Sequence, residues 1–212
     1  MLHQAPYIVV EGPIGAGKTS LSRRLAERLG TQTLLEQPEL NPFLSRFYQN
    51  MERWALPTQM SFLLQRAELL QDLKRLQKKN QRVVSDFLLD KDPLFASLNL
   101  AADEAKLYQE LYTRLQPHAP APSLVIYLQA QADILIERVR KRGVDTERPI
   151  TESYLEKVTE RYASFFHHYN ASPLFIVNAE VLNPVDQDDD FELLFQRLNA
   201  MRSYREFFGY AQ

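Results

Sequence analysis

The stretch EGPIGAGKTSLS, residues 11–22, contains the pattern GxxxxGK[ST], with Gly12, Gly17, Lys18 and Thr19 at its fixed positions. The strand-like run YIVVE precedes the glycines of this stretch, and the helical pattern TSLSRRLAERL follows them. Glycines allow a loop to turn so that successive backbone N–H groups point at phosphate oxygens, and the N-terminus of the next helix adds its dipole. The stretch therefore predicts a strand, a phosphate-binding loop and a helix, in that order.

The loop predicts binding of a nucleoside triphosphate together with a magnesium ion. We expect Lys18 to bridge the β- and γ-phosphates and the Thr19 hydroxyl to hold Mg²⁺. Asp86 ends the apolar run RVVSD, and open α/β sheets place their chemistry at the carboxyl ends of strands, so we expect Asp86 to bind the same ion or its waters. The residues predicted to surround the phosphates are Gly12, Gly15, Ala16, Gly17, Lys18, Thr19 and Ser20.

Composition limits the range of partners. The 212 residues carry 25 basic and 27 acidic side chains, a net charge of −2, which argues against binding to nucleic acid or to an anionic membrane. No cysteine is present, so disulfides and thiolate metal sites are excluded, and no apolar run approaches the ~18 residues of a membrane span. We expect one soluble, cytoplasmic domain over residues 1–212 with a small-molecule partner.

Short apolar runs alternate with long amphipathic segments along the chain. The runs with strand length and β-branched residues are YIVVE, TLLE, RVVSD, SLVIYL and LFIVN. This alternation predicts an α/β fold with a five-stranded, mostly parallel sheet and helices on both faces. We expect the longest helix from residue 57 to about residue 80, with Pro57 in its first turn, and we expect the aromatic tail from Ser203 to dock on the core or on a partner subunit.

A phosphate-binding loop alone does not separate a GTPase, an ATPase motor and a small-molecule kinase. The guanine-specific motif NKxD is absent, and no long strand ends in paired acids. The segments NPFLSRFYQNMERWALPTQMSFLLQR, SDFLLDKDPLFA and ERVRKRGVDTERPITESYLEKV follow VEGPIGAGKT in this order. With these motifs, nearly the whole chain resembles the deoxyribonucleoside kinases related to deoxycytidine and deoxyguanosine kinase, especially their bacterial deoxyadenosine and deoxyguanosine kinase branch.

The resemblance implies a P-loop kinase fold with an arginine-rich lid and a role in nucleotide salvage. An enzyme of this kind transfers the γ-phosphate of ATP, with Mg²⁺, to the 5′-hydroxyl of a deoxynucleoside. Purine deoxynucleosides are favoured, and deoxycytidine is an alternative. The family's helix-bundle interface implies a homodimer formed by the helices around residues 57–80 and 91–117.

Glu36, at the end of the run TLLE, stands where the resemblance places the carboxylate that accepts the proton of the 5′-hydroxyl. A carboxylate suits this role because it is ionised at neutral pH and can orient the hydroxyl toward the γ-phosphorus. The family usually has proline directly after this residue, whereas here Gln37 precedes Pro38, which leaves Glu39 as an alternative base.

Gln59 and Arg66 are two helical turns apart and therefore lie on one face of the long helix. The resemblance implies that this pair hydrogen-bonds the edge of the base. The other residues that it assigns to the acceptor are Tyr48 and Glu147 at the 3′-hydroxyl, Asp92 at the base edge and Phe95 stacked on the base.

The segment of about residues 138–150 resembles the family's lid, which closes over the phosphates. Arg138 and Arg142 share a helix face, and their guanidinium groups would stabilise the charge that develops on the transferring phosphoryl group. Val144 replaces a third family arginine, and the residues available to substitute for it are Arg140 and Arg148.

A second departure follows Asp86, where the family commonly has arginine and this chain has Phe87. Either Lys91 or Arg66 supplies the missing cation, or this branch works without it. Phe87 also argues against the nearest alternative function, a nucleoside monophosphate kinase of the thymidylate kinase type, which needs a cation there for the phosphate of its acceptor. The other alternative is a non-catalytic ATP-binding regulator, which would not need the acceptor residues.

Overall fold

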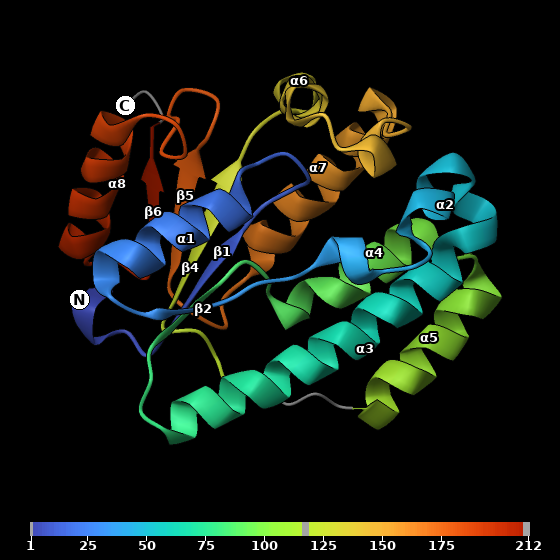
Figure 1. Cartoon of the computed structure of the whole chain (residues 1–212), viewed down its shortest axis with the longest axis horizontal. Helices are drawn as coiled ribbons and strands as arrows, with labels where there is room; N and C mark the ends of the chain where they lie inside the picture. The colour runs from blue at the N-terminus through green and yellow to red at the C-terminus, as the bar shows by residue number, and fades with distance from the viewer. Residues whose placement is uncertain (1, 116–118, 210–212) are drawn as a thin grey trace.

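The computed structural model describes residues 2–115 and 119–209, whose strands form one six-stranded sheet (Figure 1). The order across the sheet is β2-β3-β1-β4-β5-β6, and every neighbouring pair is parallel. All five apolar runs predicted as strands belong to it. The strands are β1 Tyr7–Glu11, β2 Gln32–Leu34, β3 Val83–Ser85, β4 Leu124–Gln129, β5 Leu174–Asn178 and β6 Arg205–Phe208.

The expectation of five strands is wrong, because the aromatic tail adds β6 to the edge of the sheet beside β5. Arg205 also ties the tail to the core, since its guanidinium donates to the carbonyl oxygens of Phe166 (2.9 Å) and Tyr169 (2.6 Å). Strand β6 lies at the edge of the sheet, where a strand has only one neighbouring strand and its side chains are less buried. Phe207, for example, is 58% exposed, so this strand does not need a continuous apolar run. The described part of the tail, residues 203–209, therefore docks on the core of its own chain, and residues 210–212 lie outside the described residues.

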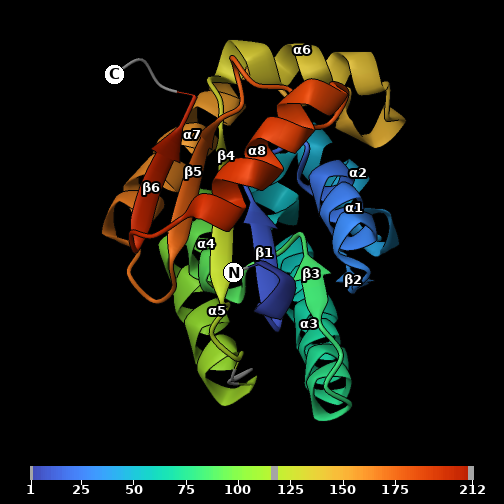
Figure 2. The same ribbon diagram turned by 90° about the vertical axis from the view of Figure 1, so that its left-hand side faces the viewer.

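Helices cover both faces of the sheet (Figure 2). Helix α1 packs on β1 and β3, and the ion pair between Arg24 and Asp188 (2.5 Å) joins it to α8. On the other face, the Phe166 ring of α7 stacks on Tyr127 of β4 with 4.2 Å between ring centroids. The helices are α1 Lys18–Leu29, α2 Leu44–Gln49, α3 Met51–Lys78, α4 Asp92–Asn99, α5 Ala102–Leu115, α6 Ala132–Arg142, α7 Glu152–His168 and α8 Asp188–Ala200.

The sequence pattern predicts that the long helix begins at Pro57. This prediction is wrong, because helix α3 begins six residues earlier, at Met51. The side chain of Asn50 caps the helix, because its Oδ1 accepts a hydrogen bond from the backbone N–H of Arg53 (3.1 Å). Pro57 lies inside the helix, where its missing N–H costs one backbone hydrogen bond. The first turns are held in place by packing, since Trp54 stacks on Phe43, and this packing outweighs the proline signal.

The carboxyl ends of the parallel strands meet at one edge of the sheet, which positions the chemistry of the molecule. Strand β1 is buried at every position and leads directly into the glycine loop. Asp86 follows β3 at the same edge. Within the described ranges, no helix has both the length and the apolar character that crossing a membrane requires.

Candidate active site

The phosphate-binding loop joins β1 to α1. Gly15 and Gly17 have φ angles of +86° and +94°, a left-handed backbone conformation that favours glycine. A Cβ atom at Gly15 would also lie 2.8 Å from the carbonyl oxygen of Leu135 in α6. The loop therefore requires glycine at these positions, and it leaves the N-terminus of α1 beside the bend of the loop.

The ammonium group of Lys18 lies across this loop. It donates to the carbonyl oxygens of Gly12 (2.8 Å) and Pro13 (3.0 Å). Burial lowers the pKa of Lys18, and the nearby Lys91 lowers it further. The remaining predicted loop residues lie in the same turn: Ala16, which is buried, and Ser20, which is exposed at the start of α1.

Asp86 faces the loop and contacts two of its neighbours. Its Oδ2 accepts a hydrogen bond from Thr19 Oγ1 (2.5 Å), and its Oδ1 accepts one from the backbone N–H of Glu36 (2.7 Å). Burial raises the pKa of Asp86. A hydroxyl and a carboxylate are oxygen ligands that Mg²⁺ accepts beside waters and phosphate oxygens. The pair of Thr19 and Asp86 therefore fits a magnesium ion that binds with a nucleotide.

Glu36 lies just beyond the end of β2, next to Asp86. Its Oε1 accepts a hydrogen bond from Arg66 Nε (2.5 Å), and its Oε2 lies 3.5 Å from Lys91 Nζ. Burial by itself raises the pKa of Glu36, but Arg66 and Lys91 outweigh it and lower that pKa to about 2. The carboxylate is therefore ionised at neutral pH. The alternative base Glu39 has an exposed side chain in the 3-10 turn η2 (Pro38–Leu40) and lies outside the cavity described below.

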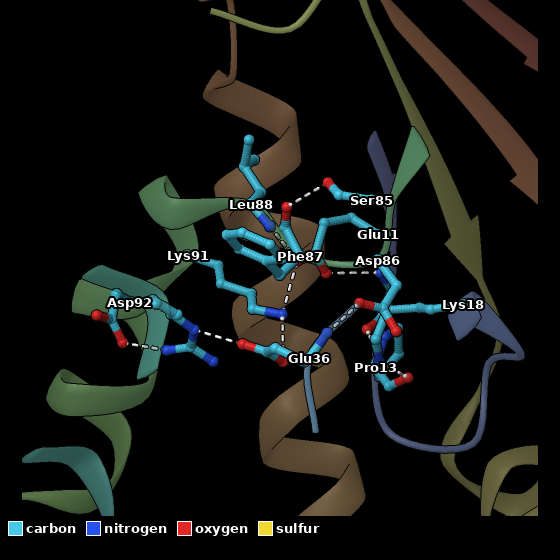
Figure 3. A network of polar contacts seen from close by, with 12 residues as sticks. Glu11, Pro13, Lys18, Glu36, Ser85, Asp86, Phe87, Leu88, Lys91 and Asp92 are labelled. Atoms are coloured by element: carbon cyan, nitrogen blue, oxygen red, sulfur yellow. Dashed lines mark hydrogen bonds and ion pairs between the residues drawn. The ribbon is translucent and has the colours of Figure 1, made fainter. Parts of the chain in front are cut away.

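Charged side chains of alternating sign continue on both sides of Glu36 (Figure 3). On one side, Arg66 bridges Glu36 and Asp92. On the other side, Lys91 lies between Glu36 and Glu11, 2.7 Å from Glu11 Oε1. Each charge faces an opposite one, which offsets the cost of removing these groups from water.

Of these groups, Glu36, Arg66 and Lys91 form part of the wall of a cavity between the phosphate-binding loop and helices α2, α3 and α4. The charged and hydroxyl side chains at the loop end of the cavity are Lys18, Thr19, Glu36, Arg66, Asp86 and Lys91. The rest of the wall is largely aromatic and includes Phe47, Tyr48, Phe62, Phe95, Tyr154 and Tyr162. A small molecule with a flat ring and a hydroxyl group could therefore stack in the aromatic part and present its hydroxyl to the carboxylate beside the loop.

A sequence model described as deoxynucleoside kinase matches residues 8–201. The chain belongs to the deoxynucleoside kinase family. This kinase is 36% identical to the deoxyguanosine kinase of Bacillus subtilis over 162 residues, which cover 76% of this chain and 78% of the relative. It is 35% identical to the deoxyadenosine kinase of Lactobacillus acidophilus over 190 residues, which cover 83% and 86% of the two chains.

Solved structures agree with this assignment. The deoxyadenosine kinase of M. mycoides, in a structure with the products dCMP and dCDP bound, aligns with a TM-score of 0.80 at 28% identity. The alignment covers 92% of this chain and 100% of that chain. The fold is therefore the P-loop kinase fold, and the protein is an ATP-dependent phosphotransferase, as the sequence predicts.

Most residues predicted to contact the acceptor lie on the cavity wall of this kinase: Tyr48, Gln59, Arg66, Phe95 and Glu147. The Oε1 atom of Gln59 is buried and has no hydrogen-bond partner among the described residues. Asp92 is not on the wall. It is fully buried at the first position of α4 and contacts Arg66 from behind, so it can fix the guanidinium but is shielded from the cavity.

The two predicted lid arginines, Arg138 and Arg142, lie on one face of α6, but their side chains have different contacts. Arg142 lines the cavity and pairs with Glu147. Arg138 donates to the carbonyl oxygen of Ala179 (2.6 Å) and lines a neighbouring hollow beside Gly15 and Gly17. The structure therefore brings only Arg142 of this pair to the wall that holds Glu36. The suggested substitutes for the third arginine lie outside that wall: Arg140, which is exposed, and Arg148, which pairs with Asp145 (2.7 Å).

Sequence reasoning does not point to several residues of this site. Glu11 carries a usable signal, because it is a carboxylate at the end of a strand buried at every position, and a buried charge needs partners. Asn99, Tyr154 and Tyr162 carry no local signal, since they reach the cavity from the end of α4 and from α7.

Proposed function

We propose that this kinase transfers the γ-phosphate of ATP to the 5′-hydroxyl of a deoxynucleoside, with deoxyadenosine or deoxyguanosine preferred over deoxycytidine. The observation that carries the proposal is the ionised Glu36 carboxylate at the junction of the phosphate-binding loop and the aromatic cavity. The preference for purines is supported by the names of the two relatives that are 36% and 35% identical.

In the proposed reaction, Glu36 accepts the proton of the 5′-hydroxyl while that oxygen forms a bond to the γ-phosphorus. The bond between the γ-phosphorus and the β-phosphate oxygen breaks, and ADP leaves. Lys18 at the loop and Arg142, which lines the same cavity, supply positive charge near the transferring group. Thr19 and Asp86 would hold Mg²⁺, which supplies further neutralisation of phosphate charge when it is bound.

The composition of the cavity wall supports the remaining roles that we propose. Gln59 and Arg66 recognise the edge of the base, Phe95 stacks on it, and Tyr48 with Glu147 binds the 3′-hydroxyl. The segment 138–150 acts as a lid on a single domain, and Arg138 acts from the nucleotide side of the loop. We place the enzyme in the cytoplasm, where ATP and salvaged nucleosides are available.

The test is transfer of labelled γ-phosphate from ATP with Mg²⁺ to each of the four deoxynucleosides, with the four deoxynucleoside monophosphates as parallel acceptors. We expect label on deoxyadenosine or deoxyguanosine above deoxycytidine and thymidine. Label on a monophosphate alone would instead identify a monophosphate kinase, and label on neither set would favour an ATP-binding regulator.

We also propose a homodimer formed through α3 and α5. Both helices carry exposed leucines, with Leu64 of α3 52% exposed and Leu107 of α5 48% exposed. Exposed apolar side chains on neighbouring helices are typical of an interface. Residues 116 and 117, which belong to the segment predicted for the interface, lie outside the described residues.

Replacing Leu64 and Leu107 together by Lys should convert the dimer into a monomer, because each substitution would bury an unpaired charge in the interface. Light scattering after gel filtration measures the mass against the 24.7 kDa of one chain. The control is Leu193→Lys on α8, which removes a leucine that is 45% exposed on another helix and should leave the dimer intact. A parent protein that elutes as one chain would contradict the proposal.

A further inference from the structure

The position after Asp86, for which the resemblance to the deoxynucleoside kinases implies an arginine, is Phe87 and does not supply a cation to this site. The Phe87 side chain is fully buried in the hydrophobic core. The segment is held in that orientation because Ser85 Oγ donates to the carbonyl oxygen of Phe87 (3.1 Å). Any cation beside Glu36 on this side of the cavity must therefore come from another residue.

Lys91 reaches that place from the end of the 3-10 turn η3 (Leu89–Lys91). Its side chain is only 3% exposed, yet it lines the cavity and lies 3.5 Å from Glu36 Oε2. Burial alone lowers the pKa of Lys91, but the carboxylates of Glu11 and Glu36 outweigh it and raise that pKa above its ordinary value. The ammonium group is therefore charged at neutral pH.

Glu11 holds Lys91 in this position. Its Oε1 accepts from the backbone N–H of Leu88 (2.9 Å) and pairs with Lys91 Nζ (2.7 Å). Its Oε2 accepts from the backbone N–H of Gly12 (2.9 Å) and from Tyr162 Oη (3.1 Å). One buried carboxylate thus connects the phosphate-binding loop, helix α7 and the turn that carries Lys91. Figure 3 shows Glu11 beside Lys91 and Leu88.

The two oxygens of Glu36 consequently have different surroundings. Oε1 is occupied by the hydrogen bond from Arg66 Nε at 2.5 Å. Oε2 faces Lys91 at 3.5 Å, a distance that keeps a favourable ion pair but is too long for a strong hydrogen bond. Oε2 is therefore the oxygen that remains available for the proton of an acceptor hydroxyl.

We infer that Lys91, anchored by Glu11, is a positioning residue that orients Glu36 Oε2 toward the acceptor and takes the place of the arginine that Phe87 replaces. The inference rests on the proposed function, because it assigns Lys91 a role in aligning the base for phosphoryl transfer. The inference requires that Lys91 affect turnover by orienting Glu36, and not only by stabilising the folded protein.

Three variants test this role: Lys91→Gln, Lys91→Arg and, as a control, Lys157→Met. Gln keeps a donor for Glu11 but removes the charge, so we expect kcat to fall by about 10²-fold while ATP affinity changes by less than about threefold. Arg keeps the charge with a different reach and should recover kcat to within about tenfold of the parent enzyme. Lys157 is an exposed lysine of α7, and its replacement should leave kcat unchanged.

The decisive measurement is the kcat of the double variant that carries both Lys91→Gln and Glu36→Gln. If Lys91 acts through Glu36, the double variant should have the kcat of Glu36→Gln alone, because a base that is absent cannot be misplaced. A folded Lys91→Gln enzyme with the parent kcat, or losses that multiply in the double variant, would overturn the inference.

Two further outcomes are informative. If Lys91→Gln does not fold, as judged by circular dichroism, Glu11→Gln decides, because it weakens the anchor of Lys91 without removing the lysine: a lowered kcat with unchanged ATP affinity supports a positioning role, and the parent kcat overturns it. A parent enzyme that phosphorylates no deoxynucleoside would refute the proposed function, whereas an active parent with an equally active Lys91→Gln variant would refute only the role of Lys91.

Discussion

Replacing Glu36 by Gln should lower kcat for deoxynucleoside phosphorylation by about 10²- to 10⁴-fold while ATP binding is retained. The amide has the shape of the carboxylate but cannot take up the proton of the 5′-hydroxyl. The fold should survive, because Arg66 keeps Asp92 as a partner and Lys91 keeps Glu11. Steady-state kinetics gives kcat, and titration calorimetry gives the affinity for ATP.

The control for this prediction is Glu39→Gln, which changes the other carboxylate of the same segment. Glu39 is exposed and lies outside the cavity, so its loss should leave kcat within about twofold of the parent value. If Glu39→Gln abolishes turnover and Glu36→Gln does not, the assignment of the base is wrong. If neither does, transfer does not use a base from this segment.

Replacing Arg66 by Met should destabilise the protein by about 3–5 kcal/mol, the largest stability effect that we expect from one substitution. The Arg66 side chain is 4% exposed and pairs with Asp92, which is 0% exposed, and with Glu36. Without Arg66, the Asp92 charge would remain buried without its partner. Urea unfolding followed by circular dichroism, at one protein concentration, gives the free energy of unfolding.

Two companion variants test the cause of this loss. Arg75→Met removes an arginine of the same helix whose pair with Asp72 is exposed, so it should change the free energy of unfolding by less than about 1 kcal/mol. Adding Asp92→Asn to Arg66→Met should recover about 1–3 kcal/mol, because it removes the unpaired charge. Equal losses in Arg66→Met and Arg75→Met would show that the buried pair does not stabilise the fold.

The parts of the fold that could be predicted are those specified by short segments. The glycine loop, the strand before it and the helix after it are local, because backbone geometry and apolar spacing within about 20 residues determine them. The same holds for the five apolar strands. The start of α3 shows where a local signal misleads: Pro57 is typical of a first turn, but the cap at Asn50 and the packing of Trp54 extend the helix upstream.

The site could be predicted in part through motifs shared with related kinases. Glu36, Tyr48, Gln59, Arg66, Phe95 and Glu147 line one cavity, as their predicted roles require. Arg138 and Asp92 show the limit of this reasoning. Spacing places a residue on a helix face, but whether its side chain reaches the cavity depends on what else packs there, and Arg66 stands between Asp92 and the cavity.

The sequence by itself determined that this protein has a phosphate-binding loop, a parallel α/β fold and many, but not all, of the residues that line the candidate site. Only the tertiary structure decided that β6 completes the sheet and that Glu11, Lys91, Glu36, Arg66 and Asp92 form one chain of charges. The physical reason is distance along the chain: these charges come from β1, the end of β2, α3, and the turn η3 with the first position of α4. Burial makes their pairing obligatory, but only the folded chain selects which cation faces which carboxylate.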